Sequence, residues 1–76
     1  MGAILPFLRE DNSVFEPETT QAMSVAFENA CLALQLKDTA VREREAVAVR
    51  IIELARRGER DPARLSGTVL RDAGAA

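Results

Sequence analysis

The sequence predicts an all-α protein, made of an antiparallel helical hairpin and a short third helix. The first observation is that apolar residues recur at three- and four-residue spacing between residues 40 and 57, which is typical of an amphipathic helix with a wide buried face. The second is a composition that is 47% hydrophobic with three Phe and no Tyr or Trp. Apolar residues that are mainly Ala, Val, Leu and Ile favour close helix packing over a β-sheet. The third is a pair of short breaks, at residues 37–39 and 58–61, that divide the chain into helix-length segments.

The length of the chain limits its stability. Seventy-six residues form one small domain, and domains of this size are marginally stable without a disulfide, a bound metal or oligomerisation. The chain has one cysteine and no histidine, so we expect no intrachain disulfide, no metal site and no cofactor. Oligomerisation, or unusually close helix packing, is left to stabilise the fold.

Residues 1–15 are expected to form an N-terminal arm. Its apolar residues keep no long helical period: Ile4, Leu5, Phe7 and Leu8. A polar turn follows them at residues 9–13, and Pro6 permits at most a short helical turn. We expect the arm to pack on the core or on a partner, and a frayed terminus is the alternative.

A single helical domain is expected over residues 16–73, with its first helix over residues 17–36. Pro17 would occupy the first helical position, to which proline is well suited. Glu16 and Glu18 are favourable beside the positive end of the helix dipole. The apolar stripe that would face the core consists of Met23, Phe27, Ala30, Cys31 and Leu34.

A second apolar stripe lies on the opposite side of this first helix. It consists of Val25, Leu32 and Leu36, and one neighbouring helix cannot cover both stripes. We therefore expect these three residues to form a further contact surface. The leading hypothesis is a homodimer in which two hairpins pair into a four-helix bundle. The alternatives are that the arm or the third helix covers this stripe, or that a groove accepts a helix of a larger protein partner.

The second helix is expected over residues 40–57. The connection before it, at residues 37–39, is so short that the first two helices should be antiparallel neighbours. Arg56 and Arg57 are favourable at the negative end of the helix dipole. Gly58 is suited to the left-handed residue that ends the helix.

The third helix is expected over residues 62–73. Asp61 can cap this helix and Pro62 can begin it. The residues that would face inward are Leu65, Val69 and Leu70. Residues 74–76 are expected to be a frayed C-terminus.

The net charge of −2 is divided unevenly along the chain. Residues 1–41 have two basic and six acidic side chains, a balance of −4, whereas residues 42–76 have eight arginines and six acidic side chains, a balance of +2. The favoured interpretation is that these charges form surface pairs, such as Arg50 with Glu53, and that the acidic first helix attracts the basic second helix.

The alternative interpretation is a small regulatory nucleic-acid-binding protein. Four arginines cluster at the turn between the second and third helices: Arg56, Arg57, Arg60 and Arg64. Such a cluster can contact phosphates, but Glu59 and Asp61 lie inside it and would weaken it. A pI near 5.0 is also unusual for a DNA-binding domain. Nucleic acid is therefore the less favoured partner.

No motif in the sequence indicates an enzyme. Cys31 lies on the apolar stripe and no histidine is present to act as its base, so we expect a structural role for it. Neither a glycine-rich phosphate-binding loop nor a metal-ligand motif occurs. We expect a non-enzymatic protein–protein interaction module with a regulatory or accessory role.

The sequence also bears on the compartment of the protein. A lone cysteine is typical of a reducing environment. No stretch reaches the ~18 apolar residues that a membrane span needs. We therefore expect a cytoplasmic protein that does not contact a membrane.

Three blocks of the sequence resemble a group of short uncharacterised helical proteins of alphaproteobacteria. They are FEPETTQAM at residues 15–23, AFENAC at 26–31 and VREREAVAVRIIELARRGERDP at 41–62. The last block is the most specific, since an amphipathic helix, an Arg-Arg-Gly stop and a Glu-Arg-Asp-Pro restart occur together. The resemblance implies a bacterial, cytoplasmic, helical protein, and it assigns no functional residue.

Overall fold

The computed structural model describes residues 4, 6, 7 and 14–74. These residues contain three α-helices, α2 (Pro17–Ala33), α3 (Val41–Arg56) and α4 (Pro62–Asp72), and no strand. Pro6 and Phe7 also have helical geometry. The predicted all-α class is therefore confirmed, whereas the predicted polar turn at residues 9–13 and the last two residues of the predicted frayed C-terminus lie outside the described residues.

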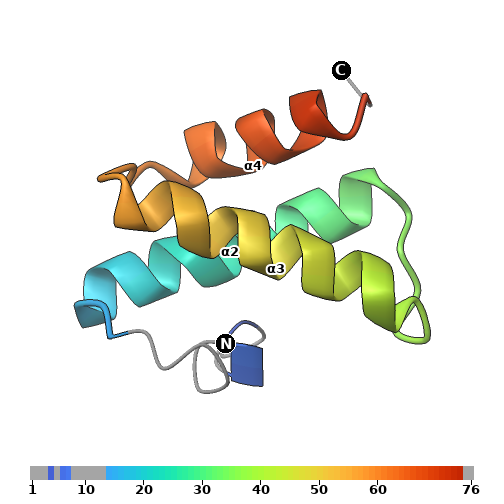
Figure 1. Cartoon of the computed structure of the whole chain (residues 1–76), viewed down its shortest axis with the longest axis horizontal. Coiled ribbons are helices and arrows are strands. Elements are labelled where there is room, and N and C mark those ends of the chain that lie inside the picture. Colours follow the sequence, from blue (N-terminus) through green and yellow to red (C-terminus); the bar gives the residue numbers. More distant parts are fainter. Residues whose placement is uncertain (1–3, 5, 8–13, 75–76) are drawn as a thin grey trace.

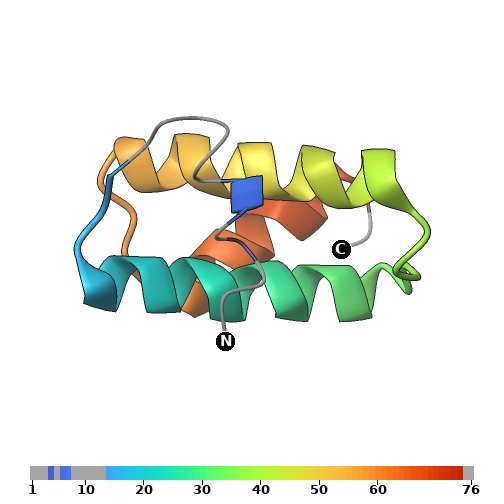
Figure 2. The ribbon, with the colours of Figure 1, turned by 90° about the horizontal axis from the view of Figure 1, so that it is seen from below.

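The three helices pack against one another around one core. Helices α2 and α3 run in opposite directions and are joined at one end by residues 34–40, and α4 lies along one side of both (Figure 1). Seen from below, α4 passes behind α2 and α3, and the described N-terminal residues (blue) lie in front of them (Figure 2). The helix pair is thus covered from two sides.

The buried residues follow the predicted helical periodicity. From α2 they include Met23, Ala26, Phe27, Ala30 and Cys31; from α3 they are Val47, Ala48, Ile51, Ile52 and Ala55; from α4 they include Leu65 and Val69. Ile4 joins this core as a fully buried side chain. The Phe7 ring lies 5.6 Å from the Phe27 ring, centroid to centroid. Ile4 and Phe7 of the predicted arm therefore pack on the core, as the first of the two hypotheses for the arm expects.

Helix α2 ends at Ala33, three residues before the predicted end. Gln35 adopts a left-handed conformation with φ of 57°. Its N–H donates to the Leu32 carbonyl at 3.0 Å, and the Leu36 N–H donates to the Cys31 carbonyl at 2.9 Å. This pair of hydrogen bonds is the Schellman motif, which reverses the chain at the end of a helix.

The Schellman motif corrects one residue of the predicted outer stripe. Leu36 comes after the reversal, so it no longer follows the helical spacing of Val25 and Leu32. Its side chain is half-buried and packs against the core. A hydrophobic contact between the residue after the turn and the last helical turn is a usual part of this motif.

Helix α3 ends and helix α4 begins at recognisable capping residues. Gly58, with φ of 108°, ends α3, and its N–H donates to the Ala55 carbonyl at 3.0 Å. The Asp61 carboxylate accepts a hydrogen bond from the Ala63 N–H at 3.1 Å at the start of α4. Val41 is an exception to the predicted buried face, since it is 65% exposed at the first position of α3. Among the described residues, no helix is both long and apolar enough to cross a membrane.

Candidate interaction surfaces

One face of α2 points away from the core and carries two exposed apolar residues. We define the outer face of α2 as the exposed residues that follow alternating three- and four-residue spacing: Glu18, Gln21, Val25, Glu28 and Leu32. Val25 is 42% exposed and Leu32 is 76% exposed. Two of the three predicted interface residues thus lie exposed on one helix face, and the third, Leu36, does not belong to this face.

Leu32 and Leu36 nevertheless come together in a groove beside this face. The groove lies where α2 connects to α3 and has a volume of about 210 Å³. Its lining residues are Glu28, Cys31, Leu32, Leu36, Asp38 and Arg44. Two leucines therefore face this groove together with two acidic residues and one arginine, whereas Val25 lies seven residues before Leu32 and outside it.

Arg44 closes one side of the groove by stacking on an aromatic ring. Its guanidinium carbon lies 5.2 Å from the centre of the Phe27 ring, within the range of a cation–π interaction. The Asp38 carboxylate is 4.0 Å from Arg44. The position of Arg44 within the apolar arc of the second helix indicated that its side chain would lie close to apolar residues. Its partner could not be predicted because Phe27 lies on a different helix.

Cys31 lies at the floor of the same groove and is buried. Burial raises the pKa of its thiol, and the nearby positive charge of Arg44 offsets part of that increase. A thiol with a raised pKa remains protonated at neutral pH and is a weak nucleophile. This environment agrees with a structural role for Cys31.

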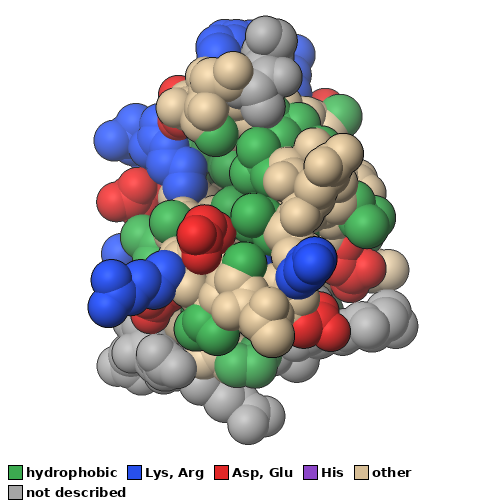
Figure 3. All heavy atoms as spheres, turned by 90° about the vertical axis from the view of Figure 1, so that its right-hand side faces the viewer, with side chains coloured by type: hydrophobic (Ala, Val, Ile, Leu, Met, Phe, Trp, Pro, Cys, Tyr) green, Lys and Arg blue, Asp and Glu red, His purple; other side chains and the backbone are tan. Residues whose placement is uncertain are grey.

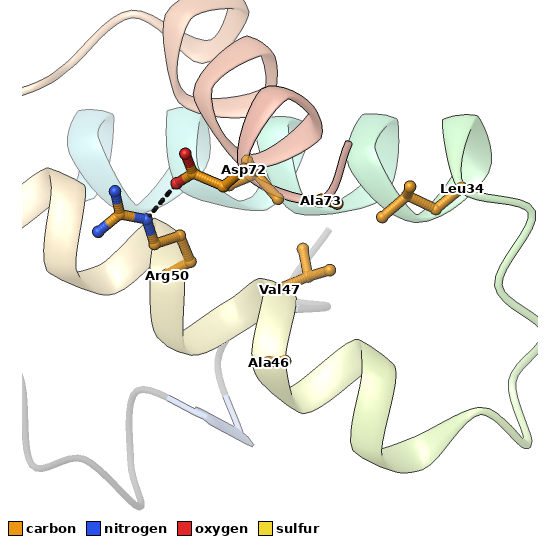
Figure 4. A pocket seen from close by; sticks show the side chains of 7 residues that line it. Leu34, Ala46, Val47, Arg50, Asp72 and Ala73 are labelled. Carbon is orange, nitrogen blue, oxygen red and sulfur yellow. Dashed lines mark hydrogen bonds and ion pairs between the residues drawn. The ribbon is translucent and has the colours of Figure 1, made fainter. Parts of the chain in front are cut away.

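A second groove lies at the end of the molecule where α2 and α4 finish. It has a volume of about 270 Å³ and is lined by Leu34, Ala46, Val47, Arg50, Val69, Asp72 and Ala73. Figure 3 shows this end, where hydrophobic side chains gather near the centre and acidic and basic side chains lie beside and around them. In Figure 4, Leu34 and Val47 point toward each other across the groove, and Arg50 and Asp72 meet beside it.

Arg50 joins α3 to α4 beside this second groove. Its Nε donates to the Asp72 carboxylate at 2.7 Å, and its Nη1 donates to Glu53 at 3.5 Å. The hydrogen bond to Asp72 is the main reason that the pKa of Arg50 is raised. The predicted pair with Glu53 is present, but the shorter contact was missed because Asp72 is 22 residues away in the sequence.

The predicted basic patch is largely occupied by contacts within the chain. The Arg60 guanidinium donates to the carbonyl of Ala55 at the end of α3, and also to the carbonyl of Glu59 at 3.3 Å. Arg64 lies 4.0 Å from the Asp61 carboxylate. Arg56 is engaged in an interaction as well, and Arg57 is the C-cap residue of α3. These contacts hold the turn between two helices, so they favour a structural role for the cluster.

Comparison of the chain with protein families, with curated proteins and with solved structures gave no match. Within the part of the chain that the structure describes, no three His, Cys, Asp or Glu side chains are grouped so that they could hold a metal ion. The outer face of α2 and the two grooves are therefore the surfaces on which a functional proposal is built.

Proposed function

We propose that this protein is a small, non-enzymatic interaction module that self-associates as a homodimer through the outer face of α2. In this proposal two copies pair as a dimeric helix bundle, with a regulatory or accessory role in the cytoplasm of a bacterium. The compartment and the source are those implied by the lone cysteine and by the resemblance to the alphaproteobacterial group.

The observation that carries the proposal is the exposure of Leu32 in line with Val25. The two residues lie seven positions apart on the side of α2 that faces away from the core. Covering a large apolar side chain contributes about 1.5–3 kcal/mol. In a domain of this size, such a contribution is large relative to a stability of about 5–15 kcal/mol, so a second copy that covers this face would stabilise the fold substantially.

The non-enzymatic part of the proposal is supported by the residue types that the chain contains. It has no histidine that could act as a general base near neutral pH. Its one cysteine is buried, and burial raises the pKa of the thiol. Arg56, Arg57 and Arg60 have contacts or a capping position of their own, and Glu59 and Asp61 lie within the same cluster, so nucleic acid is the less favoured partner.

The test compares substitutions of two similarly exposed valines, one on the outer face of α2 and one on α3. Val25 and Val49 lie in the middle of α2 and α3 and are 42% and 48% exposed. We expect Val25→Glu and Leu32→Glu each to weaken self-association at least about tenfold, because each places a charge in an apolar interface. Val49→Glu is the matched control and should associate as the wild type does. Sedimentation velocity from micromolar to millimolar concentration measures all four proteins.

Two results would contradict the proposal. The first is a wild-type protein that stays monomeric at millimolar concentration. The second is a dimer that Val25→Glu and Leu32→Glu leave unchanged, which would place the interface elsewhere. If the wild type is monomeric but binds a helix of a larger protein, and Leu32→Glu abolishes that binding, the same face serves a different partner and the homodimer is wrong.

A further inference from the structure

We propose that the outer face of α2 in one copy packs against the outer face of α4 in the other copy, with glutamates of α2 opposite arginines of α4. We define the outer face of α4 as the exposed residues Arg64, Gly67 and Arg71. This inference rests on the proposed self-association and adds the identity of the surface that meets the outer face of α2 around Val25.

The charges on α2 disfavour pairing of two α2 outer faces. This helix contains Glu18 and Glu28 and has no lysine or arginine. Both glutamates lie on the outer face, one on each side of Val25 along the helix. Bringing two copies of this face together would gather four glutamates and no basic residue of α2 at one interface, and like charges at an interface disfavour binding.

The outer face of α4 carries the complementary charge. Arg64 and Arg71 are exposed, and Arg64 lies 4.0 Å from the Asp61 carboxylate, a long contact at the surface. The one acidic residue within α4, Asp72, is held by Arg50 of α3. The two arginines are therefore placed to meet carboxylates of another molecule.

The spacing of the two faces allows them to fit. Glu18 and Glu28 are ten residues apart, or about 15 Å along a helix, and Arg64 and Arg71 are seven residues apart, or about 10 Å. Arginine side chains are long enough to span that difference. Val25 lies between the two glutamates, just as Gly67 lies between the two arginines. A Cβ atom added to Gly67 would meet no atom within 4 Å, so this position leaves room for Val25 of the second copy.

The pairing can occur twice in one dimer. Helices α2 and α4 pack directly against each other within a copy, so their outer faces lie on adjoining sides of the molecule (Figure 1). In a two-fold dimer, α2 of each copy would meet α4 of the other. Two contacts are also needed on grounds of area, because a stable dimer buries about 800 Å² per partner and one helix face provides only part of that.

The experiment uses charge reversal on each face. One variant carries Glu18→Lys and Glu28→Lys, and the other carries Arg64→Glu and Arg71→Glu. Each variant alone would have two faces of the same sign, and we expect its self-association to be at least tenfold weaker than that of the wild type. An equimolar mixture should restore a dimer that contains one copy of each variant, as measured by sedimentation velocity. Arg42→Glu with Arg57→Glu, which changes the net charge as the α4 variant does, is the control and should associate as the wild type does.

The outcomes separate this inference from the proposed function. A wild-type protein that remains monomeric at millimolar concentration overturns self-association itself. A wild-type dimer that survives Arg64→Glu with Arg71→Glu, or variants that do not combine when mixed, overturns only the α2–α4 pairing. Circular dichroism checks that each variant is folded. If a reversal unfolds the protein, Glu18→Gln with Glu28→Gln and Arg64→Gln with Arg71→Gln replace it, and each pair should weaken the dimer and reduce its salt sensitivity; an unchanged dimer again overturns the pairing.

Discussion

Arg50 and Asp72 connect the middle of α3 to the last residue of α4 through a 2.7 Å hydrogen bond between Nε and a carboxylate oxygen. Both side chains remain partly exposed, so the contact closes the rim of the groove at this end and lies outside the core. It is shorter than the ion pairs of Arg44 with Asp38, Arg50 with Glu53 and Arg64 with Asp61. Its main effect is therefore to fix the end of α4 against α3.

Removing this contact should loosen the end of α4. We expect Asp72→Asn to lower the midpoint of urea unfolding slightly, because the amide keeps the shape of the side chain but loses the charge. The same variant should lose part of the wild type's sensitivity to salt. Asp38→Asn is the control, since the Asp38 contact with Arg44 is 4.0 Å long and its carboxylate is fully exposed. Equal effects of the two substitutions would contradict this assignment.

Glycine at position 35 should stabilise the protein. Gln35 is the only non-glycine residue of the described chain with a positive φ, and the left-handed conformation disfavours side chains with a Cβ by about 1–2 kcal/mol. Glycine also has more conformational entropy in the unfolded chain, and this offsets part of the gain from relieving the positive φ. We therefore expect Gln35→Gly to raise the free energy of unfolding by about 0.5–1 kcal/mol in urea titrations. Gln35→Ala keeps the Cβ and should give no such gain. If both variants were equally stable, relief of the positive φ could not be the cause.

The N-terminal arm should contribute to stability through Ile4. This side chain is fully buried, and truncation of a buried isoleucine to alanine costs about 2–5 kcal/mol. We therefore expect Ile4→Ala to destabilise the protein strongly in thermal or urea unfolding. Val14→Ala, at a position that is 92% exposed, should change the stability by less than about 0.5 kcal/mol. An Ile4→Ala protein as stable as the wild type would support the frayed-terminus expectation.

Cys31 should make the protein less stable at alkaline pH. Burial raises the pKa of its thiol in the folded state, whereas the thiol of the unfolded chain ionises near pH 8.5. The folded state therefore holds the proton more tightly, so the contribution is fully present below about pH 8.5 and decreases as the pH rises through the folded-state pKa. We expect Cys31→Ala to show a smaller loss of stability above this pH than the wild type does.

The same burial can be tested by alkylation. Iodoacetamide should modify Cys31 slowly in the native protein at pH 8 and rapidly in urea, because the thiolate is the reactive form and the native thiol is both buried and protonated. A native reaction rate that matches the rate in urea would show that the thiol is accessible, and would remove the basis for its structural role.

The positions and inward faces of the helices could largely be predicted from the sequence. Apolar spacing identified most of the buried residues of α3, and Asp61 and Gly58 marked helix ends because their side-chain chemistry suits caps. The end of α2 could not be predicted in the same way. Gln35 has no local preference for the left-handed conformation, and the tertiary packing of Leu36 accompanies the reversal there.

Of the candidate interaction surfaces, the outer face of α2 could be predicted from helical spacing, whereas the two grooves could not. The exposure of Val25 and Leu32 follows from their position opposite the core stripe, which helical spacing determines. The grooves depend on contacts between residues that are distant in the sequence, such as Arg44 with Phe27 and Arg50 with Asp72. Such contacts leave no periodic signal, and self-association itself stays a prediction.

The position of Ile4 has a consequence for how the chain reaches its final form. The other residues of the apolar core span positions 23 to 69, so the site that Ile4 occupies forms only after the helices have assembled. Contacts between distant parts of a chain form late, because the intervening segment must first be closed into a loop. Translation makes this isoleucine before the residues that enclose it, so its side chain would stay in water until those residues had been synthesised and had folded.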